Sequence, residues 1–300
     1  MVLALAPHEP QPVPITRENI FDTPMTPFEE WLFSLARQNP ARFRQLVTEW
    51  VDMCPAFDGP EDGADVVPPG CLTPIPIPEY WKIPVHLEPG GFGNPKVVRL
   101  SQVSKAQWTF TREENVREWL SRLYGDAPPR RFLDIGTGTG TTAIVCAELF
   151  PETEVIGIDL SAPYIRFARE WAKRRGLTNV QFYQQNAQQT IFPDASFDAV
   201  HFTYVLHEMP VEDARKILRE LYRLTTPGGR LSMFDGLYPD TEEERQRKAQ
   251  FSKITGIEPY LGEYMKLNVE KAIAETGFTE VTRHFAVPDG MVVSARKPAA

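Results

Sequence analysis

The stretch LDIGTGTG, residues 133–140, decides how the second half of this chain folds. The mostly apolar segment Arg131–Ile135 precedes the glycines and predicts a strand. Residues 141–150 follow the glycines and predict a helix, so the glycines form a tight turn between the two. Glycine adopts positive φ and lets the backbone approach a ligand closely, while the first turn of a helix leaves free N–H groups. This turn is therefore a candidate ligand site.

Strands and helices alternate from this turn to the end of the chain. Repeated strand–helix units imply a parallel sheet with right-handed crossovers. The last two strands meet at Pro288-Asp289-Gly290, which is a hairpin signal. We therefore predict an α/β fold over residues 127–300, with a doubly wound, mostly parallel seven-stranded sheet and an antiparallel C-terminal hairpin. The expected strands are 131–135, 154–159, 180–184, 199–205, 230–234, 279–287 and 291–295, and the expected helices are 141–150, 162–175, 211–224 and 269–276.

Proline distinguishes the first hundred residues, which hold 17 of the 28 prolines. Proline removes a backbone donor, so a regular sheet is excluded there. The pattern predicts one helix that begins after Thr26 and stops at Pro40, a second over 41–53, and a third over 101–125. Between them, residues 55–96 are rich in glycine and proline but also in apolar side chains, and we call this segment the strap. We predict that residues 1–126 form a helical, proline-rich cap that contributes to a substrate pocket.

Composition and charge limit the classes of function. Hydrophobic residues at 42% and charged residues at 24% are typical of globular proteins. The net charge of −8 and the pI of about 5.3 argue against nucleic-acid binding, since such domains concentrate positive charge. Cys54, Cys71 and Cys146 cannot form a disulfide framework and indicate free thiols in a reducing compartment. We find no apolar run long enough for a membrane span or a secretion signal, so we expect a cytoplasmic protein.

Two acidic residues flank the glycine-rich turn. The pattern D-x-G-x-G-x-G differs from the dinucleotide fingerprint G-x-G-x-x-G. The negative charge of Asp134 beside the turn suits an ammonium or sulfonium ligand better than a pyrophosphate. Asp159 ends the second strand, nineteen residues after Gly140, where a carboxylate accepts hydrogen bonds from both ribose hydroxyls of an adenosine.

Three motifs together carry a family resemblance: residues 133–140, Gly157-Ile-Asp159-Leu-Ser161 and Pro227-Gly228-Gly229. Over about residues 127–297 the chain resembles class I S-adenosylmethionine-dependent methyltransferases, of the ubiquinone/menaquinone C-methyltransferase-like small-molecule group. The resemblance implies S-adenosyl-L-methionine as cofactor, S-adenosyl-L-homocysteine as product and a small acceptor, apolar or aromatic. The acceptor atom and the oligomeric state stay open.

The resemblance also assigns site residues. The turn and Asp134 would hold the methionine end of the cofactor, Asp159 the ribose and Leu160 the adenine. Asn186-Ala187 stands where Asp-Ala is common, and the asparagine carbonyl could still accept a bond from the adenine amino group. The cofactor-binding residues implied in this way are Asp134, Gly136, Thr137, Gly138, Gly140, Asp159, Leu160, Asn186, Ala187 and Thr203.

The catalytic candidates come from two segments. His207 follows the fourth strand and titrates near neutrality, so it is a candidate general base, with Glu208 to orient it. A structural hydrogen bond is the alternative for His207. His86 in the strap is the second candidate base. We expect Tyr80, Trp81 and Tyr204 to line the substrate pocket, and no metal site, because clustered Asp and Asn ligands are missing at this edge.

Three other functions remain as alternatives. A scaffold that binds the cofactor without turnover would act through protein contacts. A nicotinamide-dependent oxidoreductase could use the same Asp159, although the glycine spacing counts against it. An arsenite-type methyltransferase would need cooperating cysteines, and Cys146 lies in the middle of a predicted helix.

Overall fold

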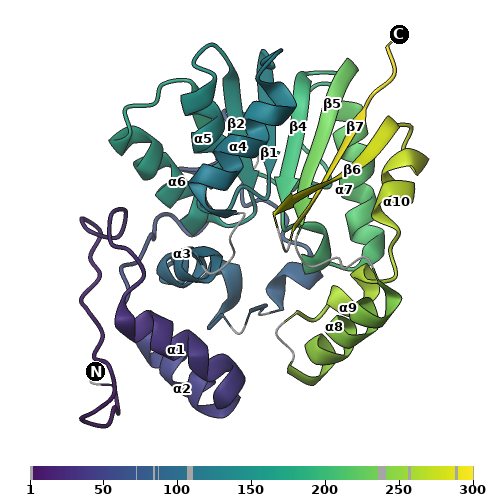
Figure 1. Cartoon of the computed structure of the whole chain (residues 1–300). Coiled ribbons are helices and arrows are strands. Elements are labelled where there is room, and N and C mark those ends of the chain that lie inside the picture. Colours follow the sequence, from purple (N-terminus) through teal and green to yellow (C-terminus); the bar gives the residue numbers. More distant parts are fainter. Residues whose placement is uncertain are drawn as a thin grey trace.

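A single sheet with helices on both faces forms the upper part of the molecule, and the N-terminal helices lie beneath one end of it (Figure 1). The computed structural model describes residues 3–71, 73–83, 85–86, 88–106, 111–235, 241–255, 258–287 and 290–299. Among these residues, no helix is long and apolar enough to cross a membrane.

The sheet has seven strands in the order β3-β2-β1-β4-β5-β7-β6. The first five are parallel, and β7 pairs antiparallel with both β5 and β6, which confirms the predicted fold class. The predicted hairpin residues Pro288 and Asp289 lie outside the described residues. The strands are β1 Arg131–Ile135, β2 Glu154–Asp159, β3 Val180–Gln184, β4 Phe197–Thr203, β5 Thr225–Asp235, β6 Thr279–Val287 and β7 Gly290–Arg296.

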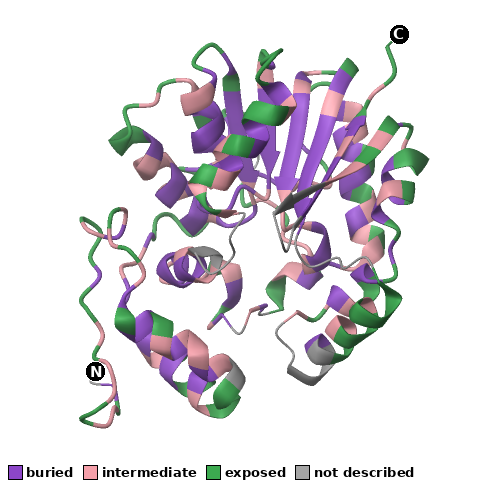
Figure 2. Cartoon of the chain, in the orientation of Figure 1, coloured by how far each residue is buried: buried purple, intermediate pink, exposed green. Residues whose placement is uncertain are grey.

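Two apolar cores lie on the two faces of the sheet. The helices α4 Glu113–Tyr124, α5 Thr141–Leu149 and α6 Ala162–Arg174 cover one face, and α7 Val211–Leu224 and α10 Val269–Glu275 cover the other. Successive strand residues point to opposite faces, so Phe132 joins the first core and Leu133 the second. Figure 2 shows the central strands β1, β2 and β4 buried along most of their length, whereas the described side chains of the edge strand β6 are exposed or intermediate.

Glycine is required where α5 begins. Gly140 has φ of 89°, and a Cβ atom there would lie 2.9 Å from the Cβ of Ala168 in α6. The absent side chain lets the strand turn directly into the helix and lets α5 and α6 pack closely.

The predicted helix over 101–125 is wrong in its extent. The structure has α3 Val98–Ala106 and then α4 as separate helices, with residues 107–110 between them outside the described part. Val116, Trp119, Leu120 and Tyr124 are the buried residues of α4. The strand predicted over 199–205 ends at Thr203 instead, because Tyr204 takes a positive φ of 55°.

The N-terminal helices are α1 Pro27–Gln38 and α2 Pro40–Val51. Thr26 and Glu29 form the reciprocal capping box that starts α1, and Asn39 caps α2. Their apolar faces share a core with α3 and with two α6 residues, Tyr164 and Phe167. The N-terminal core is therefore closed by a helix of the sheet region.

The strap reaches the carboxyl ends of the strands. It contains two short helices, η1 Glu79–Lys82 and η2 Gly91–Gly93. The Ser161 hydroxyl, just after β2, donates to the carbonyl of Phe92 at 2.6 Å. After β5, α8 Glu242–Thr255 and α9 Leu261–Tyr264 approach the same edge from the other side (Figure 1).

Candidate functional site

The glycine-rich turn and Asp159 meet at the carboxyl edge of the sheet. Gly136, Gly138 and Gly140 all have positive φ, between 54° and 89°. The Gly138 N–H donates to one carboxylate oxygen of Asp159 at 2.9 Å, and the Ser161 N–H donates to the other at 2.8 Å. These two bonds hold the Asp159 carboxylate in a fixed orientation at the turn.

Asp134 is buried beside the turn and bonds to it. Its side chain is 1% exposed, and it accepts a hydrogen bond from the Thr137 hydroxyl at 2.6 Å. The Thr137 N–H donates in turn to the carbonyl of Ile158. The acidic side chain therefore contributes its negative field to the turn and also sets the turn's shape.

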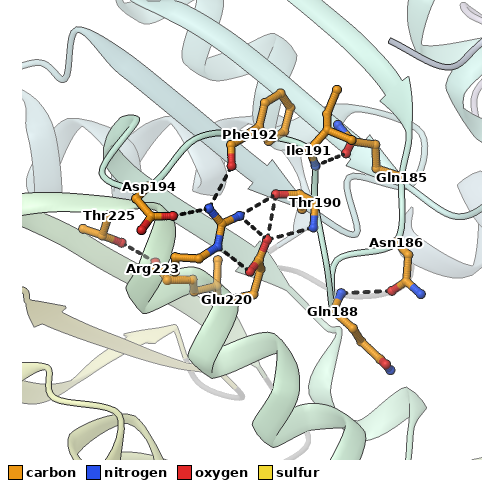
Figure 3. Close-up of polar contacts among 11 residues, drawn as sticks. Gln185, Asn186, Gln188, Thr190, Ile191, Phe192, Asp194, Glu220, Arg223 and Thr225 are labelled. Carbon is orange, nitrogen blue, oxygen red and sulfur yellow. Dashed lines mark hydrogen bonds and ion pairs between the residues drawn. The ribbon is translucent and has the colours of Figure 1, made fainter. Parts of the chain in front are cut away.

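The polar loop after β3 carries Asn186 and Ala187, which are both partly buried. The Asn186 side-chain oxygen accepts from the Gln188 N–H at 2.9 Å, so one of its two lone pairs is already used (Figure 3). Gln185 N–H donates to the carbonyl of Asp159, which ties the loop to the end of β2. Leu160 is buried beside this junction at 8% exposure.

An ion-pair network in α7 holds the far end of this loop (Figure 3). Glu220 accepts from both the N–H and the hydroxyl of Thr190, at 2.7 and 2.8 Å. Arg223 bonds to Glu220, to Asp194 and to the carbonyl of Phe192. The loop is thus anchored at both ends, and the position of Asn186 is determined by β2 and α7 together.

Tyr80, one of the two predicted aromatic residues of the strap, lies beside the loop. An open groove of about 760 Å³ runs between η1 and the loop, lined by Tyr80, Asn186, Gln188, Asp213 and Tyr260 among others. Gln188 donates to the Tyr80 hydroxyl at 3.2 Å, and Tyr260 meets the Tyr80 ring edge-on. Burial raises the pKa of Tyr80 to about 12, so the hydroxyl stays protonated.

Trp81 and Tyr204 lie elsewhere. The Trp81 ring is 6.4 Å from Phe92, and Phe92 is 6.0 Å from His86. The Tyr204 ring is 5.7 Å from the ring of His207. The structure therefore places Tyr80 at the open groove and Tyr204 beside the catalytic candidates.

The three catalytic candidates come together in one cluster. His86 Nε2 lies 3.1 Å from Glu208 Oε1 and 2.6 Å from Glu258 Oε1. His207 Nε2 lies 3.6 Å from the same Glu208 oxygen. We call these four residues the histidine–carboxylate cluster. His86 comes from the strap, His207 and Glu208 from the short helix Leu206–Glu208, and Glu258 from the segment between α8 and α9.

Carboxylates govern the protonation of this cluster. Burial by itself would lower the pKa of His207, but Asp235 at 3.1 Å from Nδ1 raises it to about 10. Burial also opposes the charge on His86, and Glu208 and Glu258 raise its pKa well above the usual range. Burial would raise the pKa of Glu208, whereas His86 and His207 lower it. His207 is thus an imidazolium donor to Asp235 at neutral pH, and its action as a base stays a prediction.

The sequence analysis missed four residues around these candidates. Glu258 contacts His86, and Glu88 has an oxygen 4.0 Å from His86 Nδ1. Asp235 ends β5 and accepts from His207 and from the Tyr264 hydroxyl at 2.8 Å. An acidic residue at the end of a parallel strand is the one signal that could have found Asp235.

Thr203 is tied to the sheet interior. Its hydroxyl lies 2.8 Å from Nε2 of His201, whose Nδ1 lies 2.8 Å from the Ser232 hydroxyl. His201 is 0% exposed between the rings of Phe132 and Phe234. The hydroxyl of Thr203 thus has a structural partner, and a role in cofactor binding stays a prediction.

Acid is expected to destabilise the protein through His201. Burial lowers its pKa from 6.5 to about 3, so the unfolded chain binds a proton that the native state does not. The contribution of neutral His201 to the free energy of unfolding is fully present above pH 6.5 and is lost as the pH falls toward 3. At pH 5 the loss amounts to about 2 kcal/mol. Urea unfolding at pH 7.5 and pH 5 measures this loss as a difference between two proteins. The wild type should lose about 2 kcal/mol more than His201→Gln over this range, because the raised pKa values of His86 and His207 act equally in both. An equal loss in the variant would assign the effect to other groups.

The three cysteines are free. Cys54 and Cys146 are buried, and burial raises the pKa of Cys54 to about 12. The thiolate is the form that reacts with metals and metalloids. The protonated, enclosed Cys54 thus counts against the arsenite-type alternative.

Comparisons with known proteins agree with this geometry. Residues 132–229 match the family model described as a methyltransferase domain. The demethylmenaquinone methyltransferase of Thermus thermophilus is 41% identical over 107 residues, which are 36% of this chain and 47% of that protein. The same enzyme of Geobacillus kaustophilus is 38% identical over 122 residues, 40% of this chain and 51% of that protein. The chain spans about half the length of these curated relatives.

Solved structures share the fold at low identity. A putative O-methyltransferase from Nostoc punctiforme aligns with a TM-score of 0.54 at 21% identity, over 68% of this chain and 61% of that one. A Haemonchus contortus phosphoethanolamine N-methyltransferase, in complex with S-adenosyl-L-methionine, aligns with a TM-score of 0.53 at 19% identity, over 69% and 60%. At such identity these structures establish the architecture of the sheet and its helices.

Proposed function

Since residues 132–229 match a methyltransferase domain, we propose that this chain is a class I S-adenosylmethionine-dependent methyltransferase and transfers a methyl group from S-adenosyl-L-methionine to a small acceptor, apolar or aromatic. S-adenosyl-L-homocysteine would be the product. The observation that carries the proposal is the Asp159 carboxylate, oriented at the glycine-rich turn by the N–H groups of Gly138 and Ser161. The family match over residues 132–229 supports it.

The residues at the turn fit this cofactor. A Cβ atom on Gly136 would lie 2.5 Å from a methyl group of Val205, so a larger residue would collide with Val205 at the turn. The oriented carboxylate of Asp159 would accept from the ribose hydroxyls, and Leu160 offers an apolar surface to a purine. Asn186 and Ala187 would contact the adenine edge. Asp134 and the turn would hold the methionine end.

The chain would contribute mainly positioning. When bound, S-adenosyl-L-methionine would supply a methyl group on a sulfonium. The acceptor atom would bond in line to the methyl carbon while the carbon–sulfur bond breaks and S-adenosyl-L-homocysteine leaves. Alignment of the two reacting atoms accounts for much of the acceleration in such a step. The strap and the α8–α9 segment flank the carboxyl edge, where they would exclude water and orient the acceptor. His207, Glu208 and His86 are the proposed catalytic residues, because they gather at this edge beside Tyr204.

The nature of the acceptor rests on two supports. Aromatic side chains from the cap, Tyr80, Trp81 and Phe92, stand along the strap and offer flat apolar surfaces. The curated relatives are named for demethylmenaquinone, a ring-bearing quinone. We therefore propose ring compounds as the first acceptors to screen, with the cap (residues 1–126) providing part of their pocket.

Asp159→Ala tests the cofactor site. The variant is expected to bind S-adenosyl-L-homocysteine more weakly by about 1–3 kcal/mol, because hydrogen bonds to a charged acceptor are lost. Isothermal titration calorimetry with S-adenosyl-L-homocysteine, S-adenosyl-L-methionine and NAD measures this. Asp126→Ala is the matched control, since Asp126 is exposed between α4 and β1 and takes no part in the site.

The outcomes separate the alternatives. Unchanged affinity in Asp159→Ala would remove this residue from the site, and binding of NAD alone would support the oxidoreductase. Tight binding of S-adenosyl-L-homocysteine without turnover of any quinol, phenol or amine would favour the scaffold.

A further inference from the structure

Four side chains of metal-ligating types converge where the strap, the turn after β4 and the segment after α8 meet. The ligand atoms of His86, His207, Glu208 and Glu258 all lie within 4.8 Å of one another. We propose that the histidine–carboxylate cluster binds one divalent transition-metal ion. This departs from the expectation of no metal, which considered only Asp and Asn ligands at the sheet edge. The proposal concerns binding and goes beyond methyl transfer.

The spacing of the cluster suits one ion. Bonds of about 2.0–2.2 Å from imidazole nitrogen or carboxylate oxygen place tetrahedral ligand atoms about 3.4 Å apart. Three nitrogen–oxygen pairs of the cluster are 2.6, 3.1 and 3.6 Å apart, on either side of this value, and all ligand atoms lie within 4.8 Å of one another. An ion could therefore enter with small side-chain movements.

Two carboxylate oxygens in the cluster are buried without a hydrogen-bond partner in the described part of the chain. They are Oε2 of Glu208 and Oε2 of Glu258. Burying such an oxygen unpaired is costly, and native structures nearly always satisfy it. The other oxygen of each carboxylate faces His86 Nε2. A cation bound among these residues would give both oxygens a charged partner.

Outer contacts orient the imidazoles as in metal sites. A ligating histidine almost always donates its second ring N–H to a carboxylate or carbonyl. His207 Nδ1 lies 3.1 Å from Asp235 Oδ2, and the Tyr264 hydroxyl donates to the same oxygen at 2.8 Å. With its proton on Nδ1, neutral His207 presents the Nε2 lone pair to the cluster. Glu88, only 1% exposed, has an oxygen 4.0 Å from Nδ1 of His86.

Four buried or nearly buried carboxylates, Glu88, Asp235, Glu208 and Glu258, lie around the two imidazoles. A divalent cation would bind among acidic groups and would take the place of imidazole protons.

Mixed imidazole and carboxylate ligands suit Zn²⁺, Mn²⁺, Fe²⁺ or Co²⁺ better than Mg²⁺ or Ca²⁺. Because its ligands come from the strap, from the turn after β4 and from the α8–α9 segment, the ion would join these three segments over the carboxyl edge. Binding should therefore raise the thermal stability of the full chain.

The test uses the full chain, stripped with a chelator and dialysed against Co²⁺ or Zn²⁺. We expect one ion per chain and a visible cobalt spectrum typical of nitrogen and oxygen ligands. Glu258→Gln and His86→Gln should each weaken binding at least 10-fold, and Asp235→Asn by about 10- to 100-fold through the loss of the outer contact. The matched controls are Glu263→Gln and His8→Gln. Both residues are exposed, so these variants should bind the ion as the wild type does.

Three results would overturn the proposal: no stoichiometric ion, unchanged affinity in the cluster variants, or a thiolate-to-cobalt band that places the ion on a cysteine. The wild-type stoichiometry and spectrum remain decisive if a variant fails to fold. S-adenosyl-L-homocysteine affinity, measured with and without the chelator, keeps the two proposals apart. If S-adenosyl-L-homocysteine fails to bind both with and without the chelator, the proposed methyl transfer is contradicted, whereas the metal proposal is still decided by the stoichiometry and the spectrum.

Discussion

Phe167→Ala is expected to lower the free energy of unfolding by about 3–5 kcal/mol. The ring is 0% exposed on α6, yet it packs among residues of the N-terminal part of the chain. It stacks on Phe21 with ring centroids 4.7 Å apart and meets Phe57 edge-on at 5.2 Å. Its removal leaves a cavity where the N-terminal core joins the sheet region.

Urea unfolding followed by tryptophan fluorescence measures this effect. Phe33→Ala is the matched control, because Phe33 in α1 is only partly buried and should cost less than half as much. A loss below about 1 kcal/mol in Phe167→Ala would show that the site collapses around the missing ring. A second unfolding transition in the variant would show that the N-terminal part detaches first.

Arg99→Ala is expected to cost about 3–5 kcal/mol, because it leaves a buried carboxylate without its counter-charge. Arg99 in α3 is 3% exposed and makes two bonds to Glu29 in α1, at 2.7 and 2.8 Å. It also donates to the carbonyls of Thr23 and Pro24. One guanidinium thus holds the start of α1 against α3.

The matched control is Arg215→Ala, which breaks an exposed ion pair with Glu275 at 2.8 Å. Exposed pairs are worth about 0–1 kcal/mol, so this variant should unfold nearly as the wild type does. Adding Glu29→Ala to Arg99→Ala should cost less than the sum of the single changes, since the second removes the unpaired charge. Strict additivity would contradict the pairing.

The cofactor side of the site could be predicted from the sequence because its rules are local. Positive φ at the glycines, a strand before them and an acidic residue at the next strand end are all encoded within about 30 residues. The sheet followed from the same alternation of strands and helices. Local patterning therefore predicted both the fold and the place of Asp159.

The substrate side could not be predicted in the same way. Glu258 meets His86 across more than 170 positions of sequence, and no motif surrounds either residue. The Thr203 hydroxyl bonds to His201 on the same strand, and His201 bonds to Ser232 on β5, a pairing that only the register of β4 against β5 reveals. The boundary at Tyr204 depends on a backbone conformation that an aromatic residue rarely adopts.

The shared core between α6 and the N-terminal helices has a consequence for biosynthesis. The ribosome delivers α1, α2 and α3 first, but Phe167 and Tyr164, which complete their apolar core, are made more than 60 residues after Val103. At about 5–20 residues per second, this leaves the growing chain with an uncovered apolar face for several seconds. A chaperone that binds nascent apolar segments should therefore associate with this protein during translation and release it once α6 has emerged.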